Sequence, residues 1–167
     1  MYFVELEPAF NNEGTALPLD FTVDMSDCDI YGGKPFRSPV HVTGEIRNST
    51  GIVSIKAKAE FTLDLTCDRC AASFDRTFST PIEHVLVTEL NDEDNDEFIV
   101  VDSLRYDAEP LVREDILLSL PTKVLCRDDC LGICPRCGKD LNDGPCDCKK
   151  EYDPRWDALL QLTQEDQ

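Results

Sequence analysis

The sequence predicts an α+β fold: a mainly antiparallel β-sheet domain over residues 1–106, then a short helix and a loop-rich segment over residues 107–167. Three observations predict it. Apolar and polar residues alternate with a period of two through most of the first two-thirds of the chain. Turn-forming residues separate the alternating runs. Six of the nine cysteines lie between Cys126 and Cys148, in a stretch with no such alternation.

The longest predicted strand runs from Val53 to Thr66 and alternates over all fourteen residues. Its odd-numbered, apolar face would lie on a core and its even-numbered, polar face in water. A similar alternation precedes it over residues 40–46, and the residues between the two runs, 48–51, supply turn chemistry. The two runs therefore predict an antiparallel hairpin.

Further strands are predicted on the same grounds over residues 19–25, 74–80, 84–90 and 98–101. Between the last two, the stretch Glu89–Glu97 holds six acidic residues in nine. It lacks the glycine and the terminal glutamate of a calcium-binding loop, so we interpret it as a solvated loop.

One short amphipathic helix is predicted after the sheet. Asp107 is its expected N-cap, Pro110 lies in its first turn and Pro121 ends it. We expect its apolar face to lie on the predicted sheet; the residues of that face are Val112, Ile116, Leu117 and Leu120. A last short helix is predicted from Asp153 to Leu162.

Composition excludes several classes of protein. The 167 residues carry a formal net charge of -18, which opposes binding to phosphate backbones and anionic lipid. No apolar run approaches the roughly 18 residues of a membrane-spanning helix. The N-terminus lacks the basic start of a secretory signal. We therefore expect a soluble, cytoplasmic protein.

Four cysteines form a zinc-binding pattern in the C-terminal segment. Cys134 and Cys137 belong to a C-P-x-C-G knuckle, and Cys146 and Cys148 follow within fifteen residues. Four thiolates suit tetrahedral Zn²⁺ and leave no open position for water, which is typical of a structural site. Buried or redox-active thiols are the alternative, but nothing nearby supplies the base or the βαβ context that redox chemistry needs.

Two more cysteine pairs could form a second zinc site. Cys67 and Cys70 end the long strand, and Cys126 and Cys130 follow the amphipathic helix. A metal held by both pairs would clamp the end of the sheet to the C-terminal segment. Alternatively, Cys126 and Cys130 pack as small apolar residues, or the sites exchange ligand pairs. One or two Zn²⁺ are therefore expected.

Catalytic patterns are missing from the sequence. His41 and His84 are its two histidines, and both lie in predicted strands, where a surface or interstrand role is the simpler interpretation. There is no G-x-S-x-G, no phosphate-binding glycine loop and no H-E-x-x-H. We predict that the chain is not an enzyme.

The chain resembles the YceD family of large ribosomal RNA subunit accumulation proteins. The resemblance covers most of the chain from about Val40 and rests on Leu65–Cys70, on Leu120-Pro121 followed by Cys126–Asn142, on Cys146–Cys148 and on Asp153–Leu159. It implies a bacterial or plastid protein with a non-enzymatic role in the accumulation or processing of 23S ribosomal RNA. It also implies the cysteine-rich form of the family.

The distribution of charge along the chain indicates which kind of partner it binds. Residues 1–125 hold ten basic and 24 acidic side chains, whereas residues 126–155 hold six basic and seven acidic ones. A basic ribosomal protein or ribosome-assembly factor is the favoured partner, because four thiolates on Zn²⁺ add negative charge. Direct binding of large-subunit RNA by a zinc module, and a thiol redox or metal-trafficking role, remain alternatives. The candidate contact residues are Arg127, Arg136, Lys139, Lys149, Lys150 and Arg155.

Overall fold

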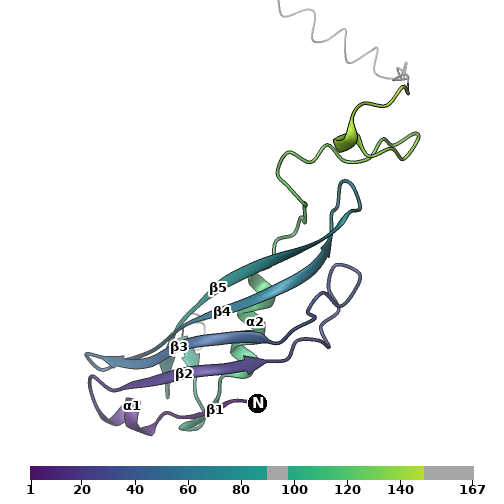
Figure 1. Cartoon of the computed structure of the whole chain (residues 1–167). Helices are drawn as coiled ribbons and strands as arrows, with labels where there is room; N and C mark the ends of the chain where they lie inside the picture. Colours follow the sequence, from purple (N-terminus) through teal and green to yellow (C-terminus); the bar gives the residue numbers. More distant parts are fainter. Residues whose placement is uncertain (90–97, 149–167) are drawn as a thin grey trace, which may run out of the picture.

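A five-stranded sheet with a helix across one face forms the body of the protein (Figure 1). The computed structural model describes residues 1–89 and 98–148. The strands lie in chain order, and every neighbouring pair is antiparallel except β5 and β6, which are parallel. This confirms the predicted α+β, mainly antiparallel fold with a C-terminal cysteine segment. The strands are β2 (Ala16–Val23), β3 (Val40–Ser49), β4 (Ile52–Thr66), β5 (Ser73–Val87) and β6 (Phe98–Val100).

Strand β5 joins two stretches that the sequence suggested as separate strands. It pairs with β4 from Val53↔Leu86 to Thr66↔Ser73 and continues through Pro81. Among the described residues, the opposite edge of β5 has a strand neighbour only at 85–87. Proline has no backbone N–H to donate. Pro81 is tolerated because no neighbouring strand on that side of β5 needs a hydrogen bond from this position.

The β3–β4 hairpin turns as the sequence predicts. Thr50 and Gly51 have φ values of 54° and 85°, the left-handed conformation that a tight two-residue hairpin turn requires. Asn48 fixes the turn from within, because its buried side chain accepts from the Gly51 N–H at 3.0 Å and donates to the Ala9 carbonyl at 2.7 Å. A turn residue thereby also anchors α1 (Glu7–Asn11).

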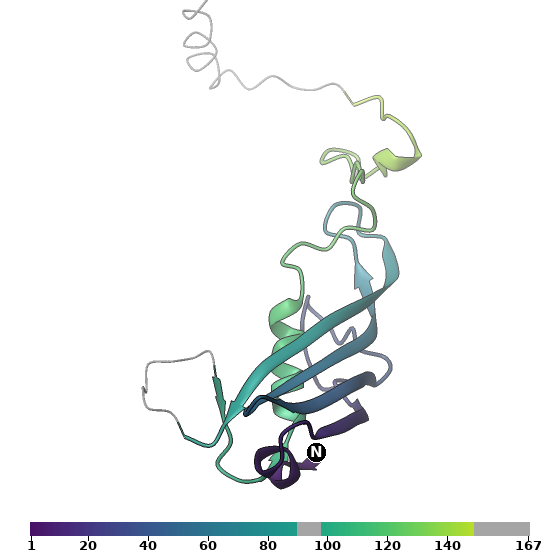
Figure 2. The same ribbon diagram turned by 90° about the vertical axis from the view of Figure 1, so that its left-hand side faces the viewer.

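The hydrophobic core lies between the inner face of the sheet and helix α2 (Glu109–Ser119), which Figure 2 shows on one face of the sheet. The helix buries Leu111, Val112 and Ile116. Leu117 is 40% exposed, so its predicted place in the apolar face was wrong. At about 100° per residue, Leu117 projects from the side of the helix opposite the buried stripe.

Both ends of α2 differ slightly from the prediction. The N-cap position is Ala108 rather than Asp107. The Asp107 carboxylate still accepts from the Glu109 N–H at 3.2 Å and satisfies a first-turn donor. The helix ends at Ser119, and Leu120 is extended, as expected of a residue that precedes proline.

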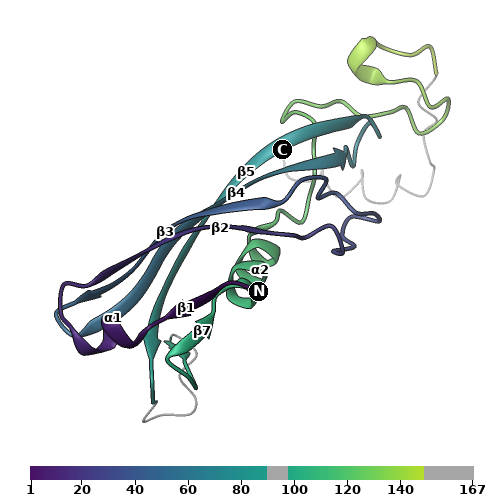
Figure 3. The ribbon, with the colours of Figure 1, turned by 60° about the horizontal axis from the view of Figure 1, so that its bottom comes forward.

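A small ribbon of β1 (Phe3–Glu5) and β7 (Arg105–Asp107) was not predicted. It joins the N-terminus to the start of α2 (Figure 3). The Tyr2 ring stacks on Phe21 with centroids 3.9 Å apart, and its carbonyl accepts from the Ala108 N–H at 3.0 Å. Three-residue strands carry too little alternation to be recognised in sequence.

Two predictions fall on residues outside those described: the solvated loop, apart from Glu89, and the helix from Asp153 to Leu162. Across residues 1–89 and 98–148, no helix is long and apolar enough to cross a membrane.

Candidate metal centres

The β4–β5 turn presents the first two cysteines. Alternation along β4 carries Leu63, Leu65 and then Cys67 to the buried side. The turn closes through the Cys67 N–H, which donates to the Ala72 carbonyl, and the Ala71 N–H, which donates to the Cys67 carbonyl, each at 2.9 Å. Cys70 thereby returns beside Cys67, as a second site that joins the two cysteine pairs requires.

Three side chains near this turn hold the segment that follows α2. Asp68 pairs with Val124 twice: its N–H donates to the Val124 carbonyl at 2.8 Å, and its carboxylate accepts from the Val124 N–H at 2.6 Å. Arg69 donates to the Cys130 carbonyl at 2.7 Å, and Arg76 donates to the Leu125 carbonyl at 2.6 Å. These contacts deliver the second cysteine pair to the end of the sheet.

The junction cluster consists of Cys67, Cys70, Cys126 and Cys130, whose sulphur atoms all lie within 4.8 Å of one another. Two sulphur pairs, Cys67–Cys130 and Cys70–Cys126, are 3.8 and 3.7 Å apart. Four thiolates at about 2.3 Å from a tetrahedral ion are about 3.8 Å apart. The cluster therefore has the size that a thiolate-bound metal ion requires, and three of its four cysteines are buried.

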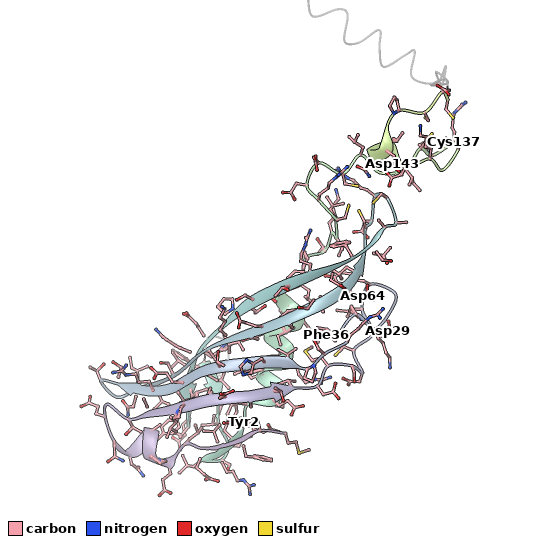
Figure 4. All side chains as sticks on the ribbon, in the orientation of Figure 1. Tyr2, Asp29, Phe36, Asp64, Cys137 and Asp143 are labelled. Atoms are coloured by element: carbon pink, nitrogen blue, oxygen red, sulfur yellow. The ribbon has the colours of Figure 1, made fainter. Side chains whose placement is uncertain are left out.

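The terminal cluster consists of Cys134, Cys137, Cys146 and Cys148, also within 4.8 Å of one another. Cys134 and Cys137 come from a tight turn, in which the Gly138 N–H donates to the Cys134 carbonyl at 2.9 Å. The short 3-10 turn η1 (Leu141–Asp143) separates the two pairs. This cluster lies beyond the end of the sheet, where Figure 4 labels Cys137, and Cys137 is exposed.

Electrostatics in both clusters favour a bound cation. In the junction cluster, burial opposes ionisation of Cys67, but backbone N–H groups of Cys126, Cys70 and Arg69 outweigh it and lower the Cys67 pKa to about 6. Burial and hydrogen bonding to the neighbouring thiols raise the Cys126 pKa to about 12. Thiols this close cannot all ionise unless positive charge neutralises them.

The terminal cluster repeats this contrast. Backbone N–H groups of Cys137 and Arg136 lower the pKa of Cys134 to about 6. Hydrogen bonding to Cys137, together with burial, raises the pKa of Cys148 to about 12. Each cluster of four cysteines could therefore hold a metal ion, and the structure groups the eight cysteines without exchanging ligand pairs.

The ninth cysteine and the two histidines lie outside the clusters. Cys28 accepts from the Arg113 guanidinium at 3.3 Å. His41 pairs with Asp20 at 2.8 Å, and His84 pairs with Asp115 at 2.7 Å. Both histidines are on strands, as the sequence indicated.

The candidate contact residues that are described lie on the cysteine segment. Arg127 donates to the Asn142 side chain at 2.7 Å and Lys139 to the Pro145 carbonyl at 2.8 Å, so both bind within the segment. Arg136 is exposed and lies on the Cys134–Cys137 turn. The other candidates, Lys149, Lys150 and Arg155, lie outside the described residues.

Sequence reasoning missed the contacts by which Asp68, Arg69, Arg76 and Asn142 support the clusters. Asp68 and Arg69 are expected to form the turn between the two cysteines of the first pair, and Asn142 is part of the motif that resembles the family, but the sequence assigns none of them a supporting contact. Nothing in the sequence marks Arg76, whose partner Leu125 is distant in the chain.

Comparison with known proteins gives one family and several uncharacterized relatives. The profile of the large ribosomal RNA subunit accumulation protein YceD matches residues 55–163. The uncharacterized protein YlbN of Bacillus subtilis is 31% identical over 152 residues, which are 88% of each chain. Uncharacterized proteins of Mycobacterium tuberculosis and Mycobacterium bovis are 38% identical over 56 residues, 34% of this chain and 27% of theirs. No solved structure matches.

Proposed function

Because the chain belongs to the YceD family of large ribosomal RNA subunit accumulation proteins, we propose that it is a non-enzymatic factor in 23S ribosomal RNA accumulation and large-subunit assembly. Its fold would be held by two structural Zn²⁺ ions, and it would act in the cytoplasm of a bacterium. Family membership is the observation that supports the biological role, and the two four-cysteine clusters are the observation that supports metal binding.

Zinc is favoured over other ions by the ligand set. Soft thiolates select zinc, copper(I) or iron–sulphur clusters, and tetrahedral four-thiolate sites are typical of structural zinc. Four protein ligands leave no position for water or substrate, so such a site supports folding rather than catalysis. The proposed ligands are Cys67, Cys70, Cys126 and Cys130 at the junction cluster and Cys134, Cys137, Cys146 and Cys148 at the terminal cluster.

A basic protein is the proposed partner. The net charge is -18, and four thiolates around Zn²⁺ add two negative charges at each cluster. Arg127 and Lys139 are also hydrogen-bonded within the cysteine segment, which leaves them fewer donors for phosphate. The negative electrostatic potential of the protein therefore favours a ribosomal protein or assembly factor with a basic surface over RNA.

Metal content and ribosomal RNA levels test the proposal. Protein purified without chelator or oxidant should contain two Zn²⁺ per chain, and a metal-free, folded protein would contradict the metal assignment. Deleting the gene should lower 23S relative to 16S ribosomal RNA. The wild-type gene should restore the ratio; a ratio that deletion leaves unchanged would contradict the biological role.

A binding experiment at several salt concentrations separates protein-mediated action from direct RNA binding. If the protein shifts large-subunit RNA in a gel and the affinity falls steeply as salt rises, phosphate contacts are direct. We expect no specific shift with RNA alone and association with a basic large-subunit protein or assembly factor.

A further inference from the structure

Asn142 connects the two cysteine clusters. It lies on η1, between Cys137 and Cys146 of the terminal cluster in the chain, yet its side chain contacts the loop of the junction cluster. Its amide nitrogen donates to the Cys130 sulphur at 3.5 Å. Its amide oxygen accepts from the Leu131 N–H at 2.8 Å and from Arg127 at 2.7 Å.

The Asn142 side chain is fixed by its own turn. Asp140 accepts from the Asn142 backbone N–H at 2.8 Å and from the amide nitrogen at 2.6 Å. With two donated and two accepted hydrogen bonds, the amide uses its full capacity. The orientation that reaches Cys130 therefore depends on η1 keeping its place.

Hydrogen bonds rather than buried apolar surface hold η1 in place in the described structure. From Cys134 to Cys148, Cys134 is the one buried residue, so this stretch has no apolar core. Backbone hydrogen bonds help, such as that from the Leu141 N–H to the Gly132 carbonyl at 2.8 Å. In a segment with so little buried surface, ligation of a metal supplies much of the ordering free energy.

The linker between the clusters is also short, and its central glycine is buried against the β4–β5 turn. Leu131, Gly132 and Ile133 separate Cys130 from Cys134. The Ile133 N–H donates to the Arg69 carbonyl at 3.1 Å. A side chain at Gly132 would place its Cβ 2.9 Å from that same carbonyl oxygen, and Gly132 has a φ of 76°. The close approach at Gly132 and the Ile133–Arg69 hydrogen bond limit how far the two clusters can move independently.

We propose that Asn142 is a positioning residue through which metal at the terminal cluster tightens metal binding at the junction cluster, so that the two clusters bind metal cooperatively. The inference rests on the proposed metal binding and goes beyond it. Groups that hydrogen-bond to a metal ligand typically contribute a factor of about 10 to 100 in metal affinity. Thermodynamic linkage requires the same factor in both directions.

The test measures zinc release from the junction cluster in full-length protein. Zinc-loaded protein is mixed with a zinc chelator and an alkylating agent, and labelling of Cys70 and Cys126 is followed by mass spectrometry. These two thiols report the junction cluster alone. Wild type is compared with Asn142→Ala and with Cys146→Ser/Cys148→Ser, which removes the terminal site. The matched control is Asp143→Ala, on the same 3-10 turn, whose side chain makes no hydrogen bond in the described structure.

Asn142→Ala should raise labelling at the junction cluster about tenfold, and removal of the terminal site should raise it at least as much. Combining the two changes should add little, because both break the same connection. Asp143→Ala should behave as wild type. Equal labelling in wild type and Asn142→Ala, or full additivity of the two changes, would overturn the coupling. Two zinc ions bound independently would refute this inference alone, whereas failure to bind zinc would also refute the metal assignment.

Discussion

Replacing Cys67 and Cys70 with serine should detach the C-terminal segment from the sheet without unfolding the sheet. The buried cysteines of the junction cluster form an apolar group separate from the main core, which is built from strands β2–β5, helix α2 and their neighbours. The variant should lose one equivalent of zinc. Residues from about 125 onward should then become mobile, while the sheet and Val124, which is buried in the main core, stay in place.

The magnitude follows from the length of chain that the cluster closes. While the sheet and α2 stay folded, the chain that the cluster closes runs at most from the end of α2 at Ser119 to Cys130. A cross-link over about ten residues restricts the open chain by about 2.7 kcal/mol, which changes an equilibrium about a hundredfold. The hydrogen bonds of Arg76 to Leu125 and of Arg69 to Cys130 remain possible after the substitution, so about a hundredfold is the upper limit for segment opening.

Limited trypsin digestion measures this opening, because cleavage follows the population of the open state when reclosing is fast. Arg127 lies within the segment, between Cys126 and Cys130, and is the diagnostic cleavage site. Cys28→Ser is the matched control, since Cys28 belongs to neither cluster. Unchanged zinc content and unchanged cleavage after Arg127 would show that Cys67 and Cys70 serve packing alone. Loss of the whole sheet would refute the separation of the two regions.

Three further perturbations test the fold and the remaining cysteine. Gly44→Ala should destabilise the protein by about 1–3 kcal/mol or more in urea unfolding, because a Cβ there would lie 2.3 Å from the Lys56 carbonyl oxygen; Gly33→Ala, with open space around it, should have little effect. Ile116→Ala should cost about 2–5 kcal/mol by leaving a cavity under α2, whereas Leu118→Ala, at a 78% exposed position, should change stability by less than about 0.5 kcal/mol. In zinc-loaded protein, Cys28 should be alkylated more slowly at pH 8 than a free thiol. Burial raises the pKa of Cys28 and so leaves less of the reactive thiolate. An alkylation rate that does not increase above pH 9 would contradict this expectation.

The sheet was predictable because its signal is local and long. Fourteen alternating residues in β4 leave one face apolar, and a shift by one residue would expose that whole face, so pattern and register agree. The β3–β4 turn was also predictable, since residues 48–51 are turn formers and Gly51 readily adopts one of the two positive φ angles that the turn requires. Weak elements were missed for the same reason: β1 and β7 are three residues each, and each gains its stability from the other.

The cysteine spacing by itself determined which residues are candidate ligands, because pairs of thiols separated by only one to three residues form a local geometry. It left the pairing of the eight cysteines open. Only the tertiary structure decided that, since Cys67 and Cys70 meet Cys126 and Cys130 through the position of α2 on the sheet and through contacts such as Asp68 with Val124. The same holds for the role of Asn142. The sequence includes Asn142 in the motif that resembles the family, but only the fold places its half-buried amide beside the Cys130 sulphur.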